Sequence, residues 1–558
     1  MIGSADRPTR TQTRFSRARA AVLFGLLVLI LPAPTSPPEP GVERLAADLK
    51  RLYPRSVNPG ERWRRRPTAA MADGREVPRE EAWRGDPGFV AASEYLLSSP
   101  AGDDARLGAW LLGTSAPERW REAEPVLVAA LSHPDQGAAF EAATALAVVG
   151  GEDAGEALLR AARWAPTAEV RAASAWAAAE LTGGSGLERK VAGPSDDVRP
   201  LGRRFRRGVS WWLSEGRGDD GRASFSRVTS LGVTWVSIHT WDPLQQGVDE
   251  PVFATPSHRH GLPNLEGLVR NAHAAGLAVM VKPHLEMRGY RPTPKERLIL
   301  RGSAGEERRR LIVRMQERSA AIMGGGHNRL LMRNDVDWRR WFAEYEAYIL
   351  PYARDAQAAG ADMFCVGREL DSTVIRRESD WRQVIGRIRS EFAGPLVYSA
   401  NFDSWEEIGF WDALDFIGVS AYFPLSDSTD PSLEELEAGW GRALEPLEVA
   451  SRRWDRPVLF TEAGFPSIAS APRAPWREEK TSADVWLQSR CFEATLRALA
   501  SRPWIEGAFF WLWERPSKPP FRDTSHTIVD KPAMFTMARH YSAGRIDPAA
   551  GPPLHPLR

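Results

Sequence analysis

Eight short apolar segments recur between residues 204 and 545, and stretches with the length and patterning of amphipathic helices separate them. The segments are Arg207–Trp212, Val233–Thr240, Leu277–His284, Met363–Gly367, Pro395–Asn401, Phe416–Tyr422, Pro457–Glu462 and Gly507–Trp513. Apolar runs of about four to eight residues that alternate with helices are typical of parallel strands buried on both faces. The pattern predicts an α/β fold, a (β/α)8 TIM barrel, in which functional side chains gather at the carboxyl ends of the strands.

The carboxyl ends of the predicted strands carry polar and aromatic residues in a shared phase. In chain order they are Trp211 with Trp212, His239 with Trp241, Lys282 with His284, Glu369, Asn401, Tyr422, Glu462, and Trp513 with Glu514. Residues with a purely structural role would not all be expected to fall at the same end of the strands. We therefore expect these side chains to line a single pocket. The long segment between Leu285 and Asp337 is predicted to be an insertion in the third βα loop that walls this pocket.

Glu369 and Glu462 offer the clearest chemistry in this set. One carboxylic acid that protonates a leaving oxygen and one carboxylate that attacks an anomeric carbon are sufficient for glycoside hydrolysis with retention. This chemistry requires neither a metal nor a cofactor, and we expect neither. His258 and His260 have the spacing of metal ligands, but they stand alone in a Pro-flanked loop and are interpreted as surface residues.

The charge balance and the tryptophan content bear on the partner. With 73 Lys+Arg and 72 Asp+Glu in 558 residues, the net charge of +1 gives no electrostatic reason to expect nucleic acid. The 22 Trp residues favour a ligand with flat apolar faces, such as a sugar, although core packing accounts for a single Trp more often. The two cysteines, Cys365 and Cys491, are too few for a disulfide scaffold and are interpreted as buried thiols.

Residues 86–183 differ in character from the barrel segment. Ala/Leu-rich stretches of helical length are broken there by Pro and Gly, and Phe140–Leu146 matches Val170–Trp176 at an offset of 30 residues. The offset predicts helical hairpin repeats of the HEAT-like kind, in which each repeat buries its face against its neighbours. A plain bundle of Ala-rich helices is the alternative. No chemistry is predicted there, and the functional hypothesis is a docking surface for a protein partner or the cell envelope.

The first 34 residues have the pattern of an export signal. Five arginines precede the apolar run Ala20–Leu31, which is short for a membrane span, and a Pro-rich stretch follows. We expect an exported protein that is periplasmic, extracellular or held by an uncleaved N-terminal membrane anchor and facing outward. Residues 35–85 are predicted to be a Pro/Arg-rich tether with some local helix, 184–203 a linker and 546–558 a Pro-rich tail.

Four stretches of the barrel segment resemble glycoside hydrolase family 113. They are Trp338–Tyr348, Phe364–Leu370, Asp415–Leu425 and Phe460–Pro466. The resemblance spans residues 204–541 and does not extend to the preceding residues. It implies membership of a clan of retaining (β/α)8 glycosidases with catalytic glutamates after strands four and seven, and the characterised members of the family are mainly β-1,4-mannanases.

The resemblance also implies roles for individual residues. Glu369 would be the general acid/base and Glu462 the nucleophile, while Trp513 would form the floor under the sugar before the cleaved bond. The full set of residues expected to bind substrate is Tyr422, Trp513, Lys282, His284, Asn401, Arg368, Trp211 and Trp241. Tyr422 would also hydrogen-bond Glu462.

One departure from the clan pattern concerns the residue before the acid/base. Many clan members have Asn there, in contact with the sugar 2-hydroxyl, whereas this chain has Arg368. The departure leaves open whether the substrate has the axial 2-hydroxyl of mannose.

The sequence therefore predicts a helical repeat domain followed by a retaining glycosidase barrel that acts on a β-linked, mannose-type polysaccharide or oligosaccharide. One alternative is a glycosidase of the same clan with another β-glycan as substrate. A second is a non-catalytic carbohydrate-binding or envelope scaffold protein, which the presence of both glutamates disfavours.

Overall fold

The computed structural model describes residues 40–52, 68–70, 76–78, 86, 88–115, 117–181, 198–212, 221–239, 242–245, 264–288, 299, 310–311, 334–479, 481–514 and 519–543. These residues form two compact units, one between residues 40 and 181 and the other between 198 and 543. The predicted export signal, most of the predicted linker, the Pro-rich tail and the pair His258 and His260 lie outside the described residues.

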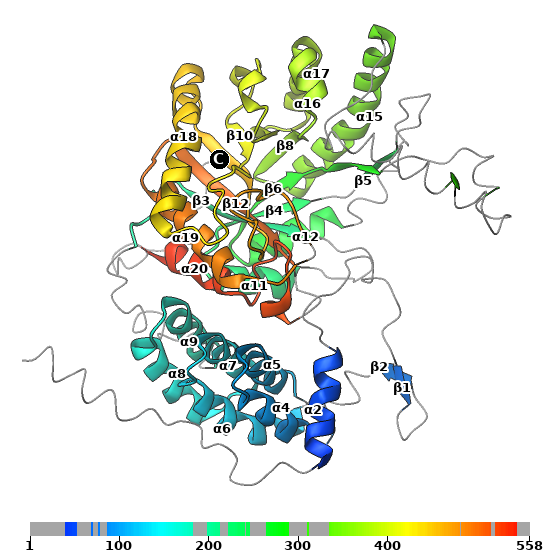
Figure 1. Ribbon diagram of the computed structural model, residues 1–558. Coiled ribbons are helices and arrows are strands. Elements are labelled where there is room, and N and C mark those ends of the chain that lie inside the picture. Colours follow the sequence, from blue (N-terminus) through cyan, green and yellow to red (C-terminus); the bar gives the residue numbers. More distant parts are fainter. Residues whose placement is uncertain are drawn as a thin grey trace, which may run out of the picture. The chain divides into compact units, whose positions relative to one another are not determined.

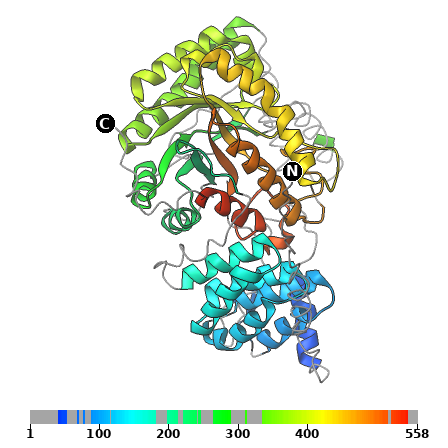
Figure 2. The same ribbon diagram turned by 90° about the vertical axis from the view of Figure 1, so that its left-hand side faces the viewer.

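The first unit consists of helices that pack as successive hairpins (Figure 1 and Figure 2). The helices are α4 (Phe89–Leu97), α5 (Gly102–Gly113), α6 (Trp120–Ala130), α7 (Gln136–Val149), α8 (Glu152–Trp164) and α9 (Ala168–Leu181), with the 3-10 turn η2 (Pro117–Arg119) before α6. Helix α4 pairs with α5, α6 with α7 and α8 with α9, while α5 packs on α7 and α7 on α9. The two matching sequence segments lie on α7 and α9, at equivalent places in stacked hairpins. The assignment to the HEAT type stays a prediction.

Helix α2 (Pro40–Leu52) lies within the segment predicted to be a tether. Its side chains Ala46 and Leu49 are buried, and the helix packs on α4. Lys50 Nζ lies 2.6 Å from Asp104 Oδ2 of α5. Two short strands, β1 (Thr68–Ala70) and β2 (Glu76–Pro78), pair antiparallel in the same segment. Residues 40–52 are therefore part of the helical unit, because an apolar stripe at helical spacing outweighs the Pro-rich surroundings.

The second unit is a closed barrel of eight parallel strands (Figure 1). They are β3 (Arg206–Trp212), β4 (Trp235–His239), β6 (Ala278–Lys282), β8 (Met363–Arg368), β9 (Leu396–Asn401), β10 (Ile417–Ser420), β11 (Val458–Ala463) and β12 (Ile505–Trp513). The strands follow this order around the ring, and β12 pairs with β3 to close it. Every strand overlaps a predicted segment, so the prediction of a TIM barrel is confirmed.

Helices follow most of the barrel strands, and short elements lie in the loops. The helices are α11 (Arg222–Ser230), α12 (Leu265–Ala274), α15 (Asp335–Ala359), α16 (Asp371–Arg376), α17 (Glu378–Glu391), α18 (Leu433–Trp454), α19 (Val485–Ala500) and α20 (Pro532–Ser542), and the 3-10 turns are η3 (Trp405–Glu407), η4 (Trp411–Ala413) and η5 (Pro520–Arg522). The side chains of Asn334, Ser432 and Asp484 cap the amino ends of α15, α18 and α19.

Two further strands, β5 (Asp242–Gln245) and β7 (Leu285–Arg288), follow β4 and β6 and pair parallel to each other. Strand β7 opens the insertion that was predicted between Leu285 and Asp337. Most of the rest of that insertion lies outside the described residues.

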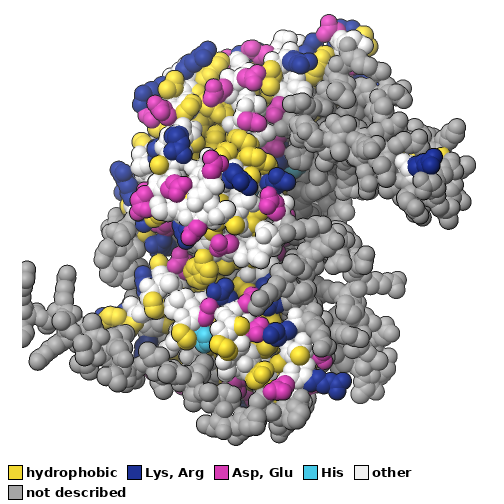
Figure 3. Space-filling model, viewed as in Figure 1, with side chains coloured by type: hydrophobic (Ala, Val, Ile, Leu, Met, Phe, Trp, Pro, Cys, Tyr) yellow, Lys and Arg dark blue, Asp and Glu magenta, His cyan; other side chains and the backbone are white. Residues whose placement is uncertain are grey.

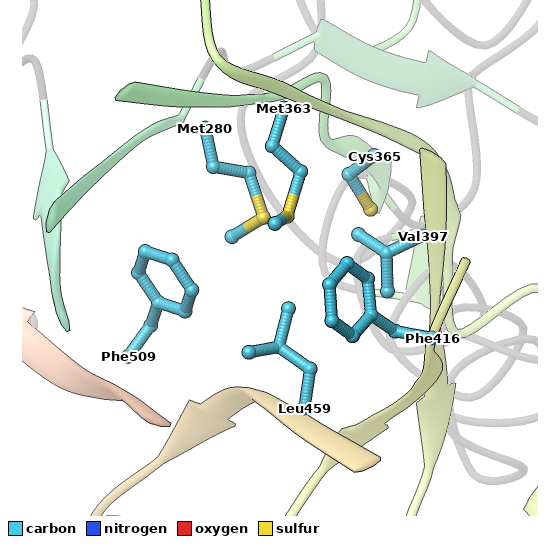
Figure 4. Close-up of a cluster of buried hydrophobic side chains, with 7 residues drawn as sticks. All are labelled: Met280, Met363, Cys365, Val397, Phe416, Leu459 and Phe509. Carbon is cyan, nitrogen blue, oxygen red and sulfur yellow. The ribbon is translucent and has the colours of Figure 1, made fainter. Parts of the chain in front are cut away.

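The barrel interior changes from apolar to polar along its axis. Nearer the amino ends of the strands, a buried cluster fills the ring (Figure 4), and it comprises Met280, Met363, Cys365, Val397, Phe416, Leu459 and Phe509. Beyond it, Ser399 Oγ lies 3.0 Å from Ser420 Oγ and 2.7 Å from Thr461 Oγ1. The charged residues Lys282 and Glu462 come next. Because the strands are parallel, all their carboxyl ends open at one rim, and the apolar cluster supports the charged layer.

On the face of the molecule shown in Figure 3, Lys and Arg side chains are interspersed with Asp and Glu side chains. This mixture agrees with the net charge of +1. Among the described residues, no helix has the length and apolarity that crossing a membrane requires. The apolar run Ala20–Leu31 lies outside them.

Glu493 on α19 is a buried carboxylate that ties this helix to α20. It pairs with Arg539 and with His540 Nε2, the latter at 2.9 Å, and accepts from Arg497 Nε at 2.7 Å. Burial alone would raise the pKa of Glu493, but these partners lower it to about 2. Its contribution to stability is therefore complete above the unfolded pKa of about 4.3 and is lost as the pH falls towards the folded value.

We expect Glu493→Gln to lower the free energy of unfolding at pH 7 by about 2 kcal/mol, because buried cationic partners lose their counter-charge. Glu448→Gln on α18 is the matched control, since its ion pair with Arg452 is exposed and should contribute less than about 1 kcal/mol. In urea denaturation between pH 7 and pH 3, the difference between wild type and Glu493→Gln should narrow with acidification. A difference that grows towards acid pH would contradict this account.

Candidate active site

Glu462 of β11 is fully buried at the carboxyl end of the barrel and is hydrogen-bonded through both oxygens. Its Oε1 accepts from Lys282 Nζ at 2.8 Å and from Arg368 Nε at 2.7 Å, and its Oε2 accepts from Tyr422 Oη at 2.9 Å. Burial alone would raise the pKa of Glu462, but the charges of Arg368 and Lys282 hold it well below its usual value. The carboxylate is therefore ionised at neutral pH, and three donors fix its orientation.

Arg368, the last residue of β8, joins Glu462 to Glu369. Besides the bond from Nε to Glu462, its Nη2 lies 3.1 Å from Glu369 Oε2 and its Nη1 lies 2.7 Å from His284 Nε2. A guanidinium group can only donate, so His284 accepts through Nε2 and is a neutral imidazole with its proton on Nδ1. One guanidinium thus contacts both carboxylates, which makes Glu369 and Glu462 neighbours although they come from β8 and β11.

His239 and Tyr422 stay neutral beside these charges. Burial, with the charge of Lys282, lowers the pKa of His239 well below its usual value. Its Nε2 lies 3.1 Å from Ser237 Oγ. Burial and the charge of Glu462 raise the pKa of Tyr422 well above its usual value, so its hydroxyl keeps the proton that it donates to Glu462.

Glu369 directly follows β8 in a left-handed backbone conformation with φ of 49°, which few non-glycine residues adopt. Its N–H donates to the carbonyl oxygen of Ser399 at 2.8 Å. Two residues earlier, Gly367 lets aromatic side chains approach the strand, because a Cβ there would lie 2.8 Å from Trp381 and 2.9 Å from Tyr345 Oη. The strand end is therefore held on both sides, and the Glu369 side chain keeps a fixed position with 6% of its surface exposed.

Asp371 is a third carboxyl group near the pair, and the sequence did not single it out. Burial raises the pKa of Asp371 to about 6, and the negative charge of Glu369 adds to this shift. Asn401 at the end of β9 hydrogen-bonds Asp371, and Ser404 Oγ donates to it at 2.9 Å. Asn401 therefore lies in the predicted pocket, where it supports this carboxyl group. The position of Asp371, two residues beyond Glu369, was the available signal.

Part of the barrel is similar to a known family. Residues 327–531 match the family described as Glycoside Hydrolase Family 113. In this range the barrel is similar to that family. The matched range contains Glu369, Tyr422 and Glu462, so it holds both carboxylates of the site. Comparison with curated proteins gives no match.

Several solved structures are similar to the chain. A β-mannanase of the same family from Alicyclobacillus acidocaldarius shares 26% identity, covering 61% of this chain and 97% of that chain with a TM-score of 0.47. A β-1,4-mannanase of the family shares 22% identity, covering 61% and 99% with a TM-score of 0.47. A GH5_18 protein from Streptomyces cattleya, solved with Manb1-4GlcNAc, shares 18% identity, covering 62% and 83% with a TM-score of 0.40.

The barrel packs two predicted sugar-binding tryptophans against an outer helix. Trp211 is buried, with its ring centroid 5.2 Å from that of Phe225 on α11. Trp513 is also buried, and the guanidinium carbon of Arg227 on α11 lies 5.9 Å from its ring centroid. Both rings pack between the barrel and an outer helix, which contradicts the prediction that Trp513 forms a sugar-binding floor and that Trp211 contacts substrate. Trp241 lies outside the described residues.

Trp511 lies on the side of β12 where Trp513 was expected. It is partly exposed, and its ring centroid is 5.1 Å from that of His239, edge to face. The pairing of β12 with β3 shifts register between Phe510 and Trp513, so Trp511 and Trp513 do not share a face as regular alternation would require.

Proposed function

We propose that the barrel is a retaining glycoside hydrolase that cleaves a β-linked, mannose-type polysaccharide or oligosaccharide. The observation that carries this proposal is the buried, ionised Glu462, which Lys282, Arg368 and Tyr422 hold beside Glu369. A carboxylate fixed in this way is suited to attack, and a neighbouring carboxyl group is suited to proton transfer. The family match supports the reaction class, and the resemblance to characterised mannanases supports the sugar.

The mechanism has two steps. In the first, Glu369 donates its proton to the glycosidic oxygen, the bond from that oxygen to the anomeric carbon breaks, and Glu462 forms a bond to this carbon. In the second, Glu369 accepts a proton from water, the water oxygen bonds to the anomeric carbon, and Glu462 leaves as a carboxylate. Lys282 and Arg368 stabilise that carboxylate, so they favour the second step. The bond from Tyr422 to Oε2 orients the attacking group.

Arg368 favours a second candidate, a glycosidase of the same clan with another β-glycan as substrate. Three of its nitrogen atoms contact Glu462, Glu369 and His284, at the position where many clan members have an Asn that contacts the 2-hydroxyl. The contact that would recognise an axial 2-hydroxyl is therefore replaced by a cation.

Hydrolysis of a panel of oligosaccharides would test both candidates. Purified full-length protein should release sugar from β-mannan or glucomannan oligosaccharides, and proton NMR of the first product should show the β-anomer. Activity confined to xylan or β-glucan oligosaccharides would support the second candidate. A first product with the α-anomer would contradict retention, and no hydrolysis by the folded protein would favour the non-catalytic scaffold. In a crystal structure, the two carboxyl groups should lie about 5–5.5 Å apart.

The helical unit is predicted to be dispensable for the chemistry. Deleting residues 1–193 should leave kcat/KM on a small soluble substrate within about twofold of the full-length value, because every residue assigned to the reaction lies in the barrel. Activity and near-UV circular dichroism of the truncated protein would check this. A large loss of turnover in a well-folded barrel would show that the helices complete the site.

Export is also part of the proposal, and it rests on the arginines and the apolar run Ala20–Leu31 of the N-terminal segment. The helical unit would then offer a docking surface to a protein or envelope partner. Fractionation of cells that produce the full chain would locate the protein, and recovery only in the cytoplasm would contradict export.

A further inference from the structure

A half-exposed aromatic stack stands at the carboxyl-end rim of the barrel. The rings of Trp476 and Phe402 are nearly parallel, with an interplanar angle of 21° and centroids 4.9 Å apart. Phe423 packs edge-on against Phe402 at 5.9 Å and is buried. Trp476 is 49% exposed, the highest exposure among the large aromatic side chains of the described part of the barrel. Phe402 covers one face of the indole, so the exposed surface lies elsewhere on that ring.

The stack is built on three different loops that all leave the same end of the barrel. Phe402 directly follows β9, Phe423 comes shortly after β10, and Trp476 lies in the loop after β11. The loop that carries Trp476 is hydrogen-bonded to the loops that follow β10 and β12. The N–H of Leu425 donates to the carbonyl oxygen of Pro472 at 2.7 Å, and His526 Nε2 lies 2.7 Å from the carbonyl oxygen of Pro475. A half-exposed indole on a braced loop is a preorganised binding surface.

Short links connect this stack to both carboxylates. Phe402 is adjacent in sequence to Asn401, which hydrogen-bonds Asp371 near Glu369. Phe423 is adjacent to Tyr422, which donates to Glu462. The ring of Tyr422 also contacts the ring of His526 at 6.0 Å, and His526 holds the residue before Trp476. Two members of the stack therefore directly follow, in sequence, residues that hold Asp371 and Glu462 at the carboxyl-end rim.

The order of strands around the barrel places the stack on one side of the two carboxylates. Two paths around the barrel join β11, which carries Glu462, to β8, which precedes Glu369. The shorter path, here called the short arc, contains only β10 and β9, whose following loops carry Phe423 and Phe402 of the stack. The long arc contains β12, β3, β4 and β6 and carries Trp511, His239 and Lys282. A sugar that is attacked by Glu462 fits the polar long arc with its hydrogen-bonding groups. The group that leaves on protonation by Glu369 then lies towards the short arc.

We propose that Trp476 and Phe402, backed by Phe423, form a subsite for the pyranose ring on the leaving-group side of the cleaved bond. This inference rests on the proposed function and adds to it the residues that bind the leaving sugar of a glycan that continues past the cleaved bond. The apolar face of a pyranose stacks on an indole, and an aromatic contact of this kind excludes water from both surfaces. The same subsite binds an acceptor sugar when the glycosyl-enzyme transfers its glycone to a hydroxyl group instead of water.

The test compares two substrates with the same glycone and different leaving groups. One is a manno-oligosaccharide, whose leaving group is a sugar, and the other is the corresponding glycosyl fluoride, whose leaving group cannot stack. In full-length Trp476→Ala, kcat/KM on the oligosaccharide should fall at least about fivefold further than on the fluoride, the size expected for one aromatic contact. Trp476→Phe should restore most of this difference. Trp164→Ala is the control, because Trp164 is 62% exposed and lies in the helical unit.

A second readout follows the acceptor. With the glycosyl fluoride as donor, the acceptor concentration that gives equal transfer and hydrolysis should rise by a similar factor in Trp476→Ala and in Phe402→Ala. The subsite would be overturned if Trp476→Ala lowered kcat/KM equally on both substrates. It would also be overturned if the acceptor concentration for equal transfer and hydrolysis did not change. If the wild type hydrolyses nothing, the proposed function fails on its own. The subsite is then judged by calorimetric binding of the oligosaccharides, and equal affinities for wild type and Trp476→Ala would refute it.

Discussion

Replacing Glu462 with Ala should lower kcat/KM on an unactivated oligosaccharide by about three to five powers of ten, which corresponds to about 4–7 kcal/mol of lost transition-state stabilisation. The variant lacks the attacking group, so a substrate with a good leaving group should show no burst of that group. Azide should then displace the leaving group directly and give the α-glycosyl azide from a β-linked substrate.

Glu369→Ala should lower kcat/KM on the unactivated substrate by a similar factor, but for a different reason: the variant lacks the proton donor. A substrate with a good leaving group needs little protonation, so the glycosyl-enzyme should still form and then accumulate. Azide needs no general base and should restore turnover with the β-glycosyl azide as product. Mass spectrometry of the trapped enzyme and NMR of the azides would distinguish the two variants.

The anomers of the two azides decide the assignment. If both variants give the same anomer, or if either retains turnover near the wild-type value on the unactivated substrate, the roles of Glu369 and Glu462 are wrong. Glu406→Ala provides a control for the removal of a carboxylate near the rim, because Glu406 is exposed on η3, which follows β9.

Arg368→Met should move the acid limb of the pH profile of kcat/KM upward by about 1–2 pH units and lower its maximum by about two powers of ten. Glu462 attacks only when ionised, and the charge of Arg368 is a main reason that its pKa lies well below the usual value. Removing that charge raises the pKa of Glu462, so the ionised form appears only at higher pH. Lys282 remains at 2.8 Å and limits the shift.

Arg382→Met is the matched control for this change. Arg382 lies on α17 and pairs with Glu378 and Asp412, which are largely exposed. This variant also removes one arginine that has two carboxylate partners, but at a position outside the site. The acid limb of the pH profile of kcat/KM should therefore stay at its wild-type position. An unmoved acid limb in Arg368→Met would instead show that Lys282 and Tyr422 suffice to keep Glu462 ionised.

The sequence by itself determined the barrel and the meeting of the two glutamates. Apolar runs of strand length that alternate with helices permit few other folds, and parallel strands place all their carboxyl ends at one rim. Glu369 and Glu462 each follow an apolar run, so their proximity followed from topology alone. Lys282, His284 and Tyr422 were placed in the pocket by the same reasoning, and the structure brings them to Glu462 or to Arg368.

Only the tertiary structure decided which tryptophan faces the site and what Arg368 contacts. A register shift in β12 turns Trp513 outward and leaves Trp511 beside His239, and the sequence contains no signal for that shift. The three contacts of Arg368 depend on the distances between β8, β11 and the residues after β6, which no local pattern encodes. The stack of Phe402 and Trp476 joins residues 74 positions apart, because loops that are distant in the chain leave the barrel side by side.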